Sequence, residues 1–135
     1  MSRGRKETEW VIVSTGIFTS FLFWPPFGVV SEDHKTVRAL GGWDTKVTVT
    51  TPRDIGGMVA EVVWAAPEFI GVVFTAGETV SYGQVIAVLE KVLGEKVDRE
   101  VWSVDMLKEE LVKDPENWLE KYRVVFAEGR GGVFR

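Results

Sequence analysis

The stretch Trp10-Val11-Ile12-Val13-Ser14-Thr15-Gly16-Ile17-Phe18 decides the fold class. Its first half is rich in β-branched residues, and an unbroken apolar run of this length is typical of a strand buried in a parallel sheet. Thr15 and Gly16 end that strand. Ile17–Phe23 then predicts a short apolar turn or helix, which Pro25 and Pro26 stop because proline removes backbone donors.

The same region allows a second interpretation, because no charged residue occurs between Trp10 and Ser31 and a basic flank precedes it. Such a run can be a signal anchor or a secretory peptide. We favour a buried strand, since the run contains serines, threonines and two consecutive prolines, which break a membrane-spanning helix. We therefore expect a soluble, cytoplasmic protein with no membrane partner.

Outward from this strand, residues 36–40 and 46–50 alternate apolar and polar side chains, and Gly41 and Gly42 lie between them. This arrangement predicts a β-hairpin. Thr51 and Pro52 then begin a helix that ends before Pro67, with Asp54 near its positive end.

The second half of the chain alternates strands and helices. Residues 71–75 and 97–102 predict strands, and Ser81 with Gln84 forms a capping box for a helix that ends at Gly94. Amphipathic helices are expected over 104–113 and 116–126. The order predicts an α/β fold: a partial Rossmann-like parallel sheet with a β-hairpin and C-terminal helices. We expect one domain over residues 10–127, between a flexible N-terminus (1–9) and a flexible tail (128–135).

Composition excludes several classes of function. The net charge is −4 at pH 7, and of the 16 basic residues only Arg3, Arg5 and Lys6 form a cluster, beside two glutamates, which argues against nucleic-acid binding. The chain has no cysteine and one histidine, which argues against a disulfide scaffold, a thiolate nucleophile and a zinc site. Six tryptophans and eight phenylalanines suggest an aromatic-lined pocket.

Four aromatic residues spaced by three are the candidate substrate-binding residues: Phe18, Phe21, Trp24 and Phe27. This spacing places several of them on one side of a short helix or turn. Core packing explains the same pattern equally well, so both interpretations stay open.

Candidate catalytic residues are weaker. His34 has a side chain whose pKa lies near neutrality, but its polar surroundings favour an exposed loop. Tyr82 can donate a proton to a substrate oxyanion, although its place in a first helical turn favours a structural role. Asp44, with Lys46, can form a charge pair at a pocket rim or an ordinary salt bridge.

Three segments in order resemble signatures of the NmrA-like, isoflavone-reductase-like family. Trp10–Phe18 resembles its strand and loop W-T-x-(V/I)-x-x-G-x-F, Asp44–Thr50 with the following Asp54-Ile55-Gly56 resembles its second signature, and Ala76–Gln84 resembles its third. The resemblance runs from about Trp10 to Phe126. It implies an NADP-binding fold whose C-terminal region shapes the substrate pocket.

The chain departs from that family where the dinucleotide would bind. Family members begin with a strand and a Gly-rich turn that holds the pyrophosphate, and no such turn is present. The glycines of residues 129–132 have the wrong spacing, and only Lys6 precedes the region where the reductases use a lysine. The resemblance therefore implies the substrate-side part only, truncated at both ends. Thr15, Gly16 and Ile17 would contact a cofactor only within a full dinucleotide fold.

Three functions follow as hypotheses. The chain is the substrate-side part of a reductase of a small aromatic or polyketide-like secondary metabolite, unable to transfer hydride alone, with NADP expected for a full-length relative. Alternatively, it is a cofactor-independent isomerase or cyclase, or a non-catalytic regulatory module. Because half of a parallel sheet exposes strand edges, we also expect a homodimer whose interface uses Trp10–Val30.

Overall fold

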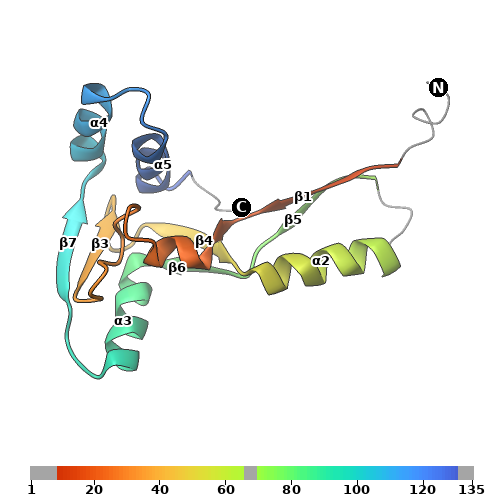
Figure 1. Cartoon of the computed structure of the whole chain (residues 1–135), viewed down its shortest axis with the longest axis horizontal. Coiled ribbons are helices and arrows are strands. Elements are labelled where there is room, and N and C mark those ends of the chain that lie inside the picture. Colours follow the sequence, from red (N-terminus) through yellow and green to blue (C-terminus); the bar gives the residue numbers. More distant parts are fainter. Residues whose placement is uncertain (1–8, 66–69, 131–135) are drawn as a thin grey trace.

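A computed structural model describes residues 9–65 and 70–130 of the chain. The chain forms two regions, which we call the arm and the body (Figure 1). The arm consists of the strands β1 (Val11–Thr15) and β5 (Gly71–Thr75) with the helix α2 (Pro52–Ala65) beside them. It extends away from the body, which contains every other element.

The body begins where β1 ends. The short strand β2 (Ile17–Phe18) leads into the 3-10 helix η1 (Thr19–Phe23), followed by the strands β3 (Thr36–Leu40) and β4 (Lys46–Thr50). After the arm, the chain continues through β6 (Glu78–Ser81), α3 (Tyr82–Leu93) and β7 (Asp98–Trp102). The helices α4 (Val104–Lys113) and α5 (Trp118–Ala127) complete it.

Parallel pairing dominates, as the sequence predicts. The strand β1 pairs in parallel with β5, β2 with β4, and β3 with β7. The antiparallel pair β4–β6 was not foreseen, because no strand was predicted over residues 78–81. The α/β class and the parallel, Rossmann-like arrangement are confirmed.

The predicted hairpin between residues 36–40 and 46–50 is wrong, although both strands exist. Leu40 pairs with Trp102 in β7, and Lys46 pairs with Ser81 in β6, so the two strands belong to different sheets. Gly41 turns the chain with a φ of 85°. An alternating pattern specifies that a segment is a strand and not which strand pairs with it.

Helix ends follow the sequence closely. Ser81 and Gln84 form the expected capping box, and Gly94 ends α3 in the left-handed conformation with a φ of 72°. Thr51 caps α2, because its hydroxyl oxygen accepts a hydrogen bond from the Asp54 amide. The predicted flexible ends and Pro67 fall mostly on residues 1–8, 131–135 and 66–69, outside the described residues.

The hydrophobic core lies entirely in the body. Within the described residues, the buried hydrophobic side chains come from η1, the following loop, β3, β4, the helices α3, α4 and α5, and the α3–β7 connection with Val97. The arm instead exposes large apolar side chains: Trp10, Ile12, Val63, Trp64 and Val72. No helix of the described residues is long and apolar enough to cross a membrane.

Candidate ligand-binding site

A hollow of about 540 Å³ opens in the body beside the end of β1. Residues from the β1–β2 connection, η1 and α5 line it: Thr15, Gly16, Ile17, Phe18, Phe21, Trp118, Tyr122, Val125 and Phe126. This lining has no charged side chain. We refer to it as the aromatic hollow.

A continuous series of aromatic ring contacts borders this hollow. On η1, the ring of Phe21 lies 5.0 Å from that of Trp24, which stacks on Trp118 with 6.1 Å between ring centroids. Along α5, Tyr122 lies 5.9 Å from Trp118 and 6.2 Å from Phe126. Ring pairs at these separations stabilise one another beyond the area they bury. The wall therefore has a defined shape.

The four predicted substrate-binding aromatic residues lie at different distances from the hollow: two line it, one packs against the lining, and one is buried in the core. Phe18 is half exposed and, together with Phe21, lines the hollow. Trp24 does not line it but stacks on Trp118, which does. Phe27 is fully buried, with its ring 4.9 Å from Phe21 and 6.0 Å from Phe126. Its side chain supports the wall from beneath and has no exposed surface to offer a ligand.

Thr15, Gly16 and Ile17 also line the hollow, at the point where the arm joins the body. A Cβ atom on Gly16 would lie 2.5 Å from the carbonyl oxygen of Thr48, closer than atoms can approach without a shift of the backbone. Glycine at position 16 therefore allows the chain to cross β4 closely and lets the β1–β2 connection form one side of the site.

Arg123 connects the α5 side of the hollow to the loop that follows η1. Its guanidinium donates hydrogen bonds to the carbonyl oxygens of Pro26 and Phe27, directly after η1, and pairs with Glu120. The same guanidinium lies 5.0 Å from the ring of Trp102. The side chain is largely buried, and bonds of this kind to a charged donor are stronger than neutral ones. The loop that follows η1 is therefore fixed to α5.

The catalytic candidates lie apart from the hollow. Tyr82 is fully buried in the core, where its hydroxyl has no hydrogen-bond partner among the described residues and burial raises the pKa of the phenol. His34 is exposed in a turn, with a φ of 58°. Asp44 lies in the exposed turn before β4, and Lys46 begins that strand with an exposed side chain.

Sequence reasoning missed Trp118 and Tyr122, which contribute much of the wall. A signal was present, because Trp118, Tyr122 and Phe126 recur every four residues along a predicted helix and therefore lie on one face. Within residues 9–65 and 70–130, no group of three or more acidic or histidine side chains is arranged to hold a metal ion.

The described residues do not fit a dinucleotide pyrophosphate. Such a group is held by free backbone N–H groups of a Gly-rich turn at a helix N-terminus. In the described part of the chain, the N-termini of the α-helices are capped by their own side chains: Thr51, Ser81, Ser103 and Asn117. These side chains already accept hydrogen bonds from first-turn amides, and no glycine-rich turn precedes any of the helices.

Comparison with known proteins finds a relative that carries an NmrA-like domain. The chain is 43% identical over 132 residues to an NmrA-like family domain-containing oxidoreductase of Gibberella moniliformis, a match that covers 96% of this chain and 43% of that protein. The chain thus spans less than half the length of this relative. No family model matches it.

Solved structures show the same fold at low sequence identity. Isoflavone reductase matches with a TM-score of 0.69 and 16% identity, over 94% of this chain and 42% of that one. The NADP(H) complex of the Citrobacter sp. triphenylmethane reductase matches with a TM-score of 0.67 and 14% identity, over 98% of this chain and 48% of that one. NmrA, a negative transcriptional regulator, matches with a TM-score of 0.60 and 20% identity, over 90% of this chain and 40% of that one.

Proposed function

We propose that this chain is the substrate-side portion of an NmrA-like oxidoreductase and binds a small, flat aromatic or polyketide-like metabolite. Its sequence is similar to that of an NmrA-like oxidoreductase, and its fold is similar to that of isoflavone reductase. The aromatic hollow is the observation that carries this proposal. Its uncharged, ring-lined walls match a flat apolar ligand, which would stack on Trp118 and Tyr122. A role in secondary metabolism and a cytoplasmic location belong to the same proposal.

Reduction of such a ligand needs a hydride donor in addition to this site. The described residues do not fit a dinucleotide, so the chain alone is proposed to bind its ligand without reducing it. In a longer relative that does bind NADP, the β1–β2 connection would form the border of the hollow toward the cofactor. Thr15, Gly16 and Ile17 are the residues of this chain at that border.

Ligand titration followed by tryptophan fluorescence tests the proposal. An isoflavone represents the neutral flat aromatics, and a cationic triphenylmethane dye serves as a charged comparison. We expect the isoflavone to quench fluorescence saturably, and Trp118→Leu to weaken its binding roughly tenfold, or about 1.4 kcal/mol. Trp64→Leu is the matched control, since Trp64 is 80% exposed on the arm. Absence of saturable binding, or equal weakening by both substitutions, would contradict the proposal.

A non-catalytic regulatory module is the second candidate. It is favoured by the position of Tyr82, His34 and Asp44, which do not line the hollow. One solved relative in fold, NmrA, is itself described as a negative transcriptional regulator. In this case the ligand would bind and remain unchanged.

A cofactor-independent isomerase or cyclase needs a group that transfers protons inside the hollow. The side-chain hydroxyls that line it belong to Thr15 and Tyr122, and that of Thr15 donates to the Gly16 carbonyl. Tyr122→Phe separates the two alternatives. Loss of turnover with retained binding would support an isomerase or cyclase, whereas a ligand recovered unchanged from the unsubstituted chain supports the regulatory module.

A further inference from the structure

The loop that follows η1 presents consecutive backbone carbonyls to two arginine side chains from different elements. Arg123 of α5 donates to the carbonyl oxygens of Pro26 and Phe27, the latter at 3.0 Å. Arg38 of β3 donates to the carbonyl oxygen of Gly28 at 3.0 Å. Among the described residues, every hydrogen bond between this loop and α5 comes from Arg123.

The ring of Trp102, at the end of β7, packs against both guanidinium groups. Its centroid lies 5.0 Å from the guanidinium carbon of Arg123 and 5.3 Å from that of Arg38. Gly28 has a φ of 86°, and a Cβ atom at this position would lie 2.8 Å from the Trp102 ring. Glycine therefore lets the loop lie close to the ring and to the two cations that pack on it.

The guanidinium of Arg123 is fully engaged. Its Nε atom donates to Phe27, one Nη atom donates to Pro26, and the other pairs with Glu120, one turn earlier on α5. A planar guanidinium fixes the direction as well as the distance of its partners, which the flexible ammonium group of a lysine does not. The geometry of Arg123 therefore sets where the loop lies relative to α5.

Backbone hydrogen bonds connect this loop to the η1 wall of the aromatic hollow. The amide of Phe27 donates to the Trp24 carbonyl oxygen at 3.0 Å, and the amide of Trp24 donates to the Phe21 carbonyl oxygen at 3.2 Å. Phe21 lines the hollow from η1, and Trp118 lines it from α5. A shift of the loop away from α5 would therefore move one wall of the hollow relative to the other.

We propose that Arg123 is a positioning residue that sets the distance between the η1 wall and the α5 wall, and thereby restricts the aromatic hollow to flat ligands. Walls held at a fixed spacing favour a planar molecule that stacks between them, because no binding energy is spent on ordering them. The nature of the ligand rests on the proposed function. The spacing rests on the contacts of Arg123 alone.

Arg38 is the matched control for Arg123. It has the same kinds of partner, namely a carbonyl oxygen of the loop, a glutamate (Glu100) and the ring of Trp102. However, Arg38 joins the loop to β3 and not to α5. Substitution of either arginine should weaken the attachment of the loop, but only substitution of Arg123 should release the two walls from one another.

Paired titrations with a flat and a bulky aromatic compound test the proposal. An isoflavone is the flat probe, and triphenylmethanol, whose three rings do not lie in one plane, is the bulky neutral probe. In Arg123→Met, the affinity for the isoflavone should fall roughly tenfold while that for triphenylmethanol does not fall, because the walls can separate. Arg38→Met should keep the preference of the unsubstituted chain for the isoflavone. The ratio of two affinities does not change merely because a fold is less stable.

Arg123→Lys keeps the experiment decisive if Arg123→Met does not fold. Lysine retains the positive charge but cannot reproduce the planar set of bonds to two carbonyls and Glu120, so the preference for the isoflavone should still decrease. An unchanged preference in the Arg123 variants, or an equal loss of preference in Arg38→Met, would overturn the proposal.

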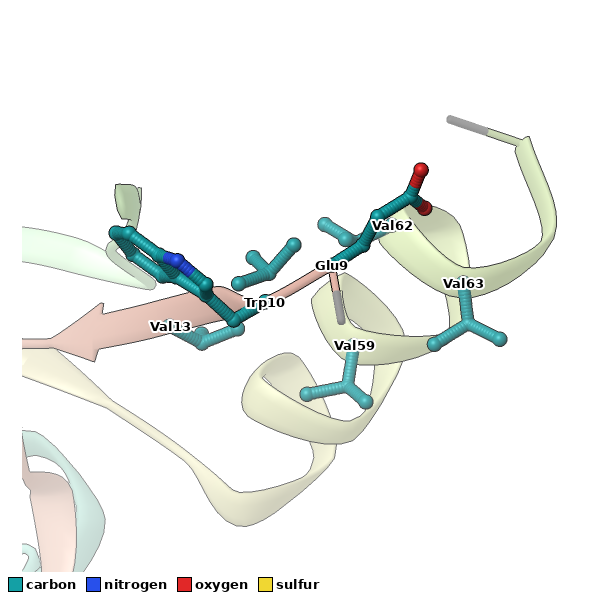
Figure 2. Close-up of a pocket in the computed structure, with 7 residues that line it drawn as sticks. Glu9, Trp10, Val13, Val59, Val62 and Val63 are labelled. Atoms are coloured by element: carbon teal, nitrogen blue, oxygen red, sulfur yellow. The ribbon is translucent and has the colours of Figure 1, made fainter. Parts of the chain in front are cut away.

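Proton NMR measures the spacing of the walls without a ligand. The ring of Trp24 stacks on that of Trp118, so separation of the walls should shift the indole N–H resonance of Trp118 in the Arg123 variants and not in Arg38→Met. Trp10 is the internal reference, because it lies in the arm, where it lines an apolar cleft between β1 and α2 with Val59 and Val63 (Figure 2). Its resonance should stay unchanged in every variant.

The two measurements separate this inference from the proposed function. An unchanged Trp118 resonance in the Arg123 variants would overturn the positioning role, whatever the ligand. A shifted resonance, in a chain whose unsubstituted form does not bind the isoflavone, would support the positioning role and contradict the proposed ligand.

Discussion

The parallel pairs β3–β7 and β1–β5 have the same length and opposite surroundings. Each aligns five residues of one strand with five of the other. In the body, Val37, Ala39 and Leu40 of β3 are fully buried. In the arm, Ile12 of β1 is 55% exposed, although the sequence of β1 is as apolar as that of β3.

The comparison shows that the helices and strands packed against a strand decide whether its side chains are buried. In the body, α3 and α5 both contact β3, and β7 closes its outer side with charged residues. In the described part of the arm, α2 is the helix that contacts both strands of the pair. A parallel pair normally has both faces covered, so the arm resembles part of a larger sheet and the body a completed core.

The largest expected effect comes from truncating equivalent aliphatic side chains in the two pairs. Leu40→Ala, in the body, should lower the free energy of unfolding by about 3 kcal/mol, because it leaves a cavity in a closed core. Ile12→Ala, in the arm, should cost less than about 1 kcal/mol, since much of the side chain already contacts water. Urea denaturation measures both values. Equal costs would show that the arm is covered in solution.

Removing a helix cap should have an intermediate effect on stability. We expect it to destabilise the whole fold when the cap is in the body, and only the local helix when the cap is in the arm. Ser81→Ala should lower the free energy of unfolding by about 1 kcal/mol, because Ser81 accepts a hydrogen bond from the Gln84 amide at the start of α3 in the core. Thr51→Ala removes the equivalent cap of α2. We expect that loss to appear as faster amide exchange within α2 and to leave the melting temperature almost unchanged. A matching drop in melting temperature for both would indicate that arm and body unfold together.

The smallest effect concerns the buried hydroxyl of Tyr82. Within residues 9–65 and 70–130 this hydroxyl has no hydrogen-bond partner, so Tyr82→Phe should change the free energy of unfolding at pH 7 by less than about 1 kcal/mol, in the stabilising direction. Thermal denaturation measures the difference. A loss above 1 kcal/mol would show that the hydroxyl has a partner in solution.

The pH dependence of the same variant sharpens this result. Burial raises the pKa of Tyr82 in the folded chain, while an unfolded tyrosine ionises near a pKa of about 10. The folded state therefore binds this proton more tightly, and stability from it is present below pH 10 and is lost as the pH rises further. Tyr82→Phe should lose less stability than the unsubstituted chain between pH 9 and 11. Tyr122→Phe is the control, because Tyr122 is half exposed.

Much of the candidate site was accessible to sequence reasoning because it depends on local order. The β1–β2 connection and η1 follow directly from one short stretch, and two of its aromatic residues, Phe18 and Phe21, line the hollow. The α5 half of the wall was missed, although the spacing of Trp118 and Tyr122 indicated one helical face. Spacing within a helix does not say which distant segment the face will meet.

The sequence by itself determined most of the elements and their caps, because hydrophobic period, capping residues and glycine act over a few neighbouring residues. The alternation of strands and helices also indicated parallel pairing, without saying which strands pair. Only the tertiary structure decided that the predicted hairpin separates into two sheets, that Phe27 lies in the core while Phe18 faces the hollow, and that Tyr82 is buried. These outcomes depend on which segments, far apart in the sequence, pack against one another. Similar apolar strands are therefore buried in the body, where helices pack on them, and exposed in the arm, where fewer elements do.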